Sequence, residues 1–138
     1  MKKYVLICLL CVVSLSWLAP TAKAIAPFKK AFQEKYVNES ENEDFKAAFK
    51  KASCNVCHIK GEKKDQRNKY AEELSKLIEG DANQRIMDAG KDGADARKAE
   101  TAKILKELEK AIETVDKMES PDGTPYGKRI AEGKLPVE

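Results

Sequence analysis

Cys54-Asn55-Val56-Cys57-His58 is a C-x-x-C-H motif in a chain of 138 residues that contains four cysteines and one histidine. The other two cysteines, Cys8 and Cys11, lie in an apolar run close to the N-terminus. Two thiols three residues apart lie on one turn of a helix, and the histidine that follows can point its ring to the same side. Outside the N-terminal run, all cysteine and histidine chemistry is therefore concentrated in this motif.

This spacing suits the covalent attachment of haem. The two thiols can add to the two vinyl groups along one edge of a haem and form thioether bonds, and the adjacent imidazole can then reach the iron. The motif therefore predicts one c-type haem per chain, bound through Cys54 and Cys57, with His58 as the proximal iron ligand.

Three other uses of the motif fit less well. A structural zinc site needs four ligands, whereas residues 25–138 offer two Cys and one His besides carboxylates. A thioredoxin-like redox pair belongs in a βαβ setting, which this sequence does not indicate. A disulfide between Cys54 and Cys57 would close only a very short loop.

Residues 1–24 have the pattern of a secretory signal peptide. Lys2 and Lys3 precede an almost wholly apolar run from Tyr4 to Leu18, and Ala22-Lys23-Ala24 is an A-x-A cleavage site. The apolar run is shorter than the roughly 20 residues that span a bilayer. We therefore expect cleavage after Ala24, no transmembrane segment afterwards, and export to the periplasm or another extracytoplasmic compartment, where c-type haem is attached.

The charge of the whole chain is misleading. Its formal net charge of +3 comes from 26 basic and 23 acidic side chains, but the leader carries three of the lysines and no acid. Residues 25–138 are therefore balanced at 23 of each, and we expect no nucleic-acid partner.

The rest of the chain shows helical spacing and no strand pattern, which predicts an all-α fold in one domain, residues 25–138. An N-terminal aromatic segment is compatible with a short helix or an extended arm. A later segment with three glycines is compatible with a loop that holds one helical turn near Met87. The segments, in order, are the aromatic one (25–40), an amphipathic helix running into Cys54 with Ser40 or Asn42 as its cap, a helix within 65–79, the loop (80–93), the longest helix (94–118) and a short last helix (125–131).

The leader and residues 54–58 together are similar to those of small exported monohaem c-type cytochromes. The resemblance implies a cytochrome c-like helical domain around the haem, with one helix leading into the motif and a short helix at the end. A four-helix-bundle cytochrome is disfavoured, because its motif lies near the C-terminus, whereas here more than half of the chain follows His58. The long charged helix predicted over 94–118 departs from the commonest small cytochromes and indicates a divergent member.

The same resemblance implies a methionine as the second axial ligand, supplied by a loop before the last helix. Met118, which lies just before the last helix, matches that position best, and Met87, which is much nearer to His58 in sequence, is the second choice. A thioether ligand would raise the reduction potential. Either methionine can instead fill a gap in the core, which leaves another ligand such as Lys or an open sixth position.

A cluster of basic residues follows the motif directly and can steer an acidic redox partner to the haem edge, although a solvated helix face has the same composition. We expect an electron carrier rather than an enzyme, since no acid–base or nucleophile set accompanies the motif. The alternative is a haem-based ligand binder or sensor with an open sixth position. Phe45, Phe49 and Tyr70 are candidates for the apolar haem shell. The basic residues are Lys60, Lys63, Lys64, Arg67 and Lys69.

Overall fold

The computed structural model describes residues 26–137 and consists there of helices and turns, with two isolated bridges as its only extended pairings. The prediction of an all-α fold is confirmed for this part of the chain. The predicted signal peptide, with Cys8 and Cys11, lies outside the described residues. In chain order the elements are α2 (Ala26–Phe32), the π-helical turn η2 (Gln33–Val37), α3 (Glu43–Ala52), the 3₁₀ turn η3 (Ser53–Val56), α4 (Lys69–Lys76), α5 (Ala82–Lys91), α6 (Ala94–Val115) and α7 (Tyr126–Ala131).

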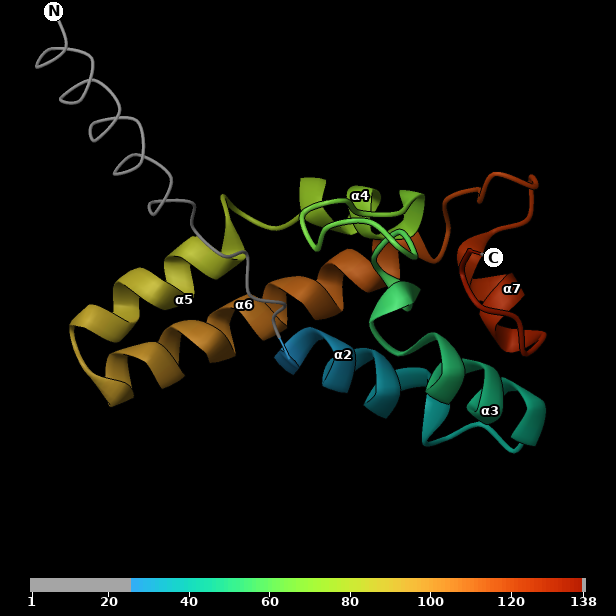
Figure 1. The fold of residues 1–138 in the computed structure, drawn as a ribbon, viewed down its shortest axis with the longest axis horizontal. Helices are drawn as coiled ribbons and strands as arrows, with labels where there is room; N and C mark the ends of the chain where they lie inside the picture. Colours follow the sequence, from blue (N-terminus) through green and yellow to red (C-terminus); the bar gives the residue numbers. More distant parts are fainter. Residues whose placement is uncertain (1–25, 138) are drawn as a thin grey trace, which may run out of the picture.

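The longest helix, α6, packs against three of the other helices. The helices α2, α4 and α5 contact it, and α5 runs beside it in the opposite direction. The helices α3 and α7 lie toward the end of the molecule that is opposite to α5 (Figure 1). The helix predicted over 94–118 is confirmed, but it ends at Val115, where the chain tightens and the Met118 N–H donates to the Val115 carbonyl at 2.9 Å. No helix between residues 26 and 137 combines the length and the apolarity needed to cross a membrane.

The expected loop over 80–93 is wrong, because residues 82–91 form the helix α5. Asp81 caps its first turn by accepting a hydrogen bond from the Gln84 N–H at 2.8 Å, and Ile86 is buried. Of the three glycines that suggested a loop, Gly80 and Gly93 have positive φ and flank the helix, while Gly90 lies inside it. Packing on α6 and a good cap therefore outweigh the weak helix propensity of glycine.

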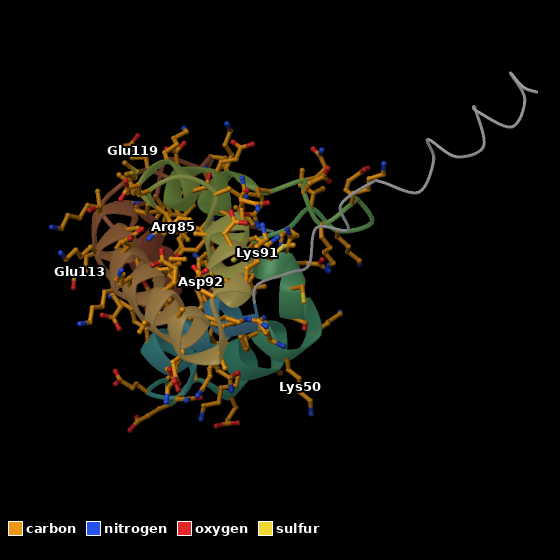
Figure 2. All side chains as sticks on the ribbon, turned by 90° about the vertical axis from the view of Figure 1, so that its left-hand side faces the viewer. Lys50, Arg85, Lys91, Asp92, Glu113 and Glu119 are labelled. Carbon is orange, nitrogen blue, oxygen red and sulfur yellow. The ribbon has the colours of Figure 1, made fainter. Side chains whose placement is uncertain are left out.

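Arg85 fastens α5 to α6. Its guanidinium donates to Glu100 at 2.8 Å and, with two nitrogens, to Glu107 at 2.8 Å each, and it also donates to the Glu79 carbonyl at 2.7 Å. Arg85 lies between the two helices, whereas side chains such as Lys50 project outward (Figure 2). The planar, bidentate guanidinium suits this bridge better than a lysine would.

The core lies where α2, α3, α4, α6 and α7 meet. Phe32 stacks on Phe49 with ring centroids 5.7 Å apart, and its edge-on contact with Tyr70 spans 6.1 Å. Tyr70 in turn packs against Tyr126 of α7 at 5.2 Å. Aromatic side chains therefore join the N-terminal, middle and C-terminal parts of the chain in one cluster.

The N-terminal segment is helical rather than extended, and the predicted helix into the motif is confirmed as α3. Of the two capping candidates, Asn42 accepts from the Phe45 N–H at 3.0 Å, whereas Ser40 accepts from the N–H of Asn42 itself. The helix predicted within 65–79 is shorter than expected, and the last helix begins at Tyr126 as predicted to within one residue.

Candidate functional site

The C-x-x-C-H motif forms one compact turn at the end of α3. Ser53 has the unusual φ of 52°, and the α-helix ends where this residue begins the 3₁₀ turn η3, in which Cys54 follows. The backbone N–H groups of Cys57 and His58 both donate to the Cys54 carbonyl, at 3.2 and 3.1 Å. Both thiols and the imidazole are therefore carried by a single hydrogen-bonded turn, and Ser53 is a strained residue next to it.

The two thiols have different surroundings. Cys54 and Cys57 are free and partly buried, and Cys57 packs against the core cluster beside the buried Val56. Burial raises the pKa of the Cys57 thiol to about 12, and the neighbouring Cys54 adds to the shift. Cys57 is therefore a neutral thiol at physiological pH. The attacking thiol of a disulfide-exchanging pair has a lowered pKa, and Cys57 does not have this property.

His58 carries a neutral imidazole with an unpartnered nitrogen. Its Nδ1 is buried and has no hydrogen-bond partner among residues 26–137. Desolvation lowers the pKa of His58, as do the charges of Lys64 and Arg67. The nearby Gln66 carbonyl opposes this shift, although it forms no hydrogen bond of standard geometry with Nδ1. A neutral imidazole is the form that binds a metal.

Asn68 holds the motif against α4, a role that the sequence did not suggest. Its side-chain amide donates to the Val56 carbonyl at 2.9 Å, and its Oδ1 accepts from the Ala71 N–H at 3.0 Å as the cap of α4. Its backbone N–H donates to the Cys57 carbonyl at 3.0 Å. Asn68 lies inside the segment predicted as helical, 65–79, and the fold shows that it caps α4 and that the same side chain also binds η3.

The two candidate methionines lie in different places. Met87 is on α5, is 50% exposed, and its sulfur accepts a weak contact from Asn83. Met118 is partly buried and packs against the same core cluster as Cys57. The fold therefore brings Met118, and not Met87, into the cluster that contains part of the motif.

The segment at Met118 is built like the segment at the motif. The Tyr126 N–H donates to the Met118 carbonyl at 3.0 Å, and the next residue, Glu119, forms a bridge with Pro125. At the motif, the carbonyl of Cys57 accepts in the same way, and His58 forms the equivalent bridge with a residue just before α4. Each loop closes on the start of a short helix, and the aromatic side chains of those two helices touch.

The three candidate shell aromatics are all in the core. Phe45, Phe49 and Tyr70 are buried, and the hydroxyl of Tyr70 forms no hydrogen bond of standard geometry in the described part of the chain. Burial is the main cause of the raised pKa of Tyr70, and Cys57 contributes to the shift, so Tyr70 lies near the motif.

The predicted basic patch is exposed on the loop after His58 and on the first residue of α4. Lys69 pairs with Glu72 at 2.9 Å, which partly neutralises that end of the patch. The remaining members, Lys60, Lys63, Lys64 and Arg67, form no ion pair with another described residue.

A groove of about 750 Å³ lies elsewhere, between α2 and α6. Ala31, Leu105 and Ile112 form part of its wall, and charged side chains from both helices surround them. None of the predicted site residues lines it. Among residues 26–137, no three His, Cys, Asp or Glu side chains converge as a metal-ion site.

Comparison with known proteins gives no match: no family model fits the chain, and no curated protein or solved structure is significantly similar to it.

Proposed function

We propose that this protein is an exported electron carrier with one covalently attached c-type haem. The observation that carries the proposal is the compact turn that presents Cys54, Cys57 and His58 together, with a neutral imidazole whose buried Nδ1 lacks a partner. These residues fit a c-type haem, because its attachment requires two free thiols for the thioether bonds and an unprotonated imidazole for the iron.

Each residue has a definite role in this proposal. Cys54 and Cys57 form the thioether bonds, His58 binds the iron, and Met118 is the candidate sixth ligand. Bound haem supplies a reversible one-electron exchange between ferric and ferrous iron. The chain's own contribution is to hold the ligands rigidly and to exclude water, which the buried aromatic cluster favours.

The raised pKa of Cys57 counts against this residue as the attacking thiol in disulfide exchange. That exchange begins with a thiolate, whereas burial keeps the Cys57 thiol protonated. The basic patch, with four members free of described ion pairs, supports docking of an acidic redox partner. Its exposure predicts a salt-dependent rate of electron transfer.

Export of the chain and the absence of enzyme activity remain part of the proposal.

The test is expression of the full chain together with haem-attachment machinery. We expect a haem absorbance that stays with the polypeptide after acid denaturation. Cys54→Ser and Cys57→Ser together should abolish this attachment, whereas a chain with only Cys8 and Cys11 replaced should keep it. Loss of all haem on denaturation of the wild type would refute the proposal.

The sixth ligand is tested by two methionine variants. In the ferric protein we expect a weak band near the red end of the spectrum, typical of thioether ligation, that disappears in Met118→Ala and remains in Met87→Ala. The exposure of Met87 makes it a matched control for the chemistry of the side chain. Rapid CO binding to the reduced wild type would instead indicate an open sixth position, and therefore a ligand binder or sensor.

A further inference from the structure

Two residues before Met118, Asp116 is bound by a side chain from the N-terminal part of the chain. The Tyr36 hydroxyl donates to Oδ1 of Asp116 at 2.6 Å, and the two residues are 80 positions apart in sequence. Both side chains are partly buried, and the bond joins η2 to the C-terminal end of α6. A short bond to a carboxylate is among the stronger hydrogen bonds in proteins.

The π-helical turn η2 explains why Tyr36 reaches this position. The turn continues α2 without a break and closes with the Asn38 N–H donating to the Gln33 carbonyl at 2.9 Å. A π turn holds one residue more than an α turn, so the side chains after it face a different direction. Tyr36 keeps contact with Phe32 at a centroid distance of 4.9 Å while its hydroxyl points to Asp116. Such turns are frequent at functional sites.

The start of α7 holds the same segment from another side. The Gly127 N–H donates to the Asp116 carbonyl at 2.9 Å, and the Tyr126 N–H donates to the Met118 carbonyl. A Cβ at Gly127 would lie 3.0 Å from the Asp116 Cβ, tighter than most Cβ contacts, so glycine favours this close approach of the two backbones. Asp116 is therefore fixed through its carbonyl by α7 and through its side chain by Tyr36.

We propose that Tyr36 is a positioning residue for the sixth iron ligand, because through Asp116 it fixes the segment that carries Met118. This inference rests on the proposed function and on Met118 as the ligand. Without the bond, the end of α6 keeps its backbone contacts with α7 and the packing of Val115 and Met118 on the core, but it loses its side-chain link to η2. The thioether of Met118 then competes less well with external ligands for the iron.

The test compares the haem-loaded wild type with Tyr36→Phe, which keeps the ring and removes only the hydroxyl. We expect cyanide to bind the ferric variant about tenfold more tightly, which corresponds to one hydrogen bond to a charged group. The ferric thioether band should weaken, and the reduction potential should fall. These readouts report on the iron, so a hydrogen bond that only stabilises the fold would not change them.

Two further variants keep the test decisive. Asp116→Asn retains an acceptor without the charge, so cyanide affinity should rise only about threefold. This variant carries the test if Tyr36→Phe does not fold. Ile104→Val removes one methyl from a fully buried site about three turns earlier on α6, and it controls for a general loss of stability without a change at the iron.

Each outcome has a distinct meaning. Unchanged cyanide affinity in both Tyr36→Phe and Asp116→Asn would overturn the positioning role. A wild type with covalent haem but no thioether band would overturn it as well, while the proposed haem attachment would stand. A wild type without covalent haem would overturn both proposals.

Discussion

Replacing Gly127 with alanine tests the closest backbone approach that holds the Met118 segment. Gly127 is the second residue of α7, and a Cβ there would lie 3.0 Å from the Cβ and 3.1 Å from the carbonyl oxygen of Asp116. Real Cβ atoms rarely have such short contacts, and the Cβ and the carbonyl oxygen of Asp116 can move only together with the backbone. The helix must therefore move away from Asp116, or the turn after α6 must open.

Two effects of opposite sign determine the size of the change. Alanine in a helix is favoured over glycine by up to about 1 kcal/mol, less near a helix end. Overpacking by one carbon costs roughly 1–3 kcal/mol. The steric effect is larger, and we expect Gly127→Ala to lose about 1–2 kcal/mol, which for a domain of this size lowers Tm by roughly 4–8 °C.

Gly90 provides the matched control. It also lies in a helix near one end, but the nearest atom to a Cβ there is the flexible Arg97 Cδ at 3.5 Å, an ordinary contact. Gly90→Ala should therefore gain about 0.5–1 kcal/mol. Thermal unfolding followed by circular dichroism measures both variants under the same conditions. Equal Tm changes for the two glycines, or a Gly127→Ala protein more stable than the wild type, would refute the close packing of α7 on Asp116.

The remaining predictions concern the α5–α6 bridge and the buried thiol. Arg85→Met should lower Tm at neutral pH. Hydrogen bonds from Arg85 lower the pKa values of Glu100 and Glu107 below the ordinary 4.5, so their stabilisation is present above that pH and is lost as the pH falls through the lowered values. The Tm difference from wild type should therefore shrink in acid, and a pH-independent difference would contradict this account. In haem-free protein with Cys54 replaced by serine, alkylation of Cys57 by iodoacetamide should keep accelerating well above the ordinary thiol pKa of 9.0, because burial is the main cause of its raised pKa. A rate that levels off near that value would show that the thiol is solvated.

The sequence predicted those helices whose apolar residues recur at helical spacing. α6 has a buried stripe that is plain in the sequence, and α3 has Phe45 and Phe49 on one face. α5 was missed, because only Ile86 is buried and three glycines outweighed it. Its stability comes from the Asp81 cap and from Arg85, whose partners lie on another helix. A local pattern does not contain such tertiary contacts.

For the candidate site too, the sequence predicted one part and missed another. The residues of the motif are adjacent in sequence, so their chemistry could be predicted without the fold. The contact between Tyr36 and Asp116 joins positions 80 apart, and the second role of Asn68 depends on where α4 lies relative to η3. Exposure, which the sequence does not give, separates Met87 from Met118, and the choice of Met118 as iron ligand stays a prediction.

The pattern of unsatisfied polar atoms points to the same part of the molecule as the motif. Among residues 26–137, two buried side-chain polar atoms lack a hydrogen-bond partner of standard geometry, His58 Nδ1 and the Tyr70 hydroxyl. His58 follows Cys57 in sequence, and Tyr70 lies close enough for Cys57 to affect its pKa. Leaving a buried polar group unpaired costs about 1–3 kcal/mol, so such groups are rare in native proteins and a functional role is one explanation for them. Both unpaired atoms therefore lie beside the one thiol that packs against the core, where attachment of a haem is proposed.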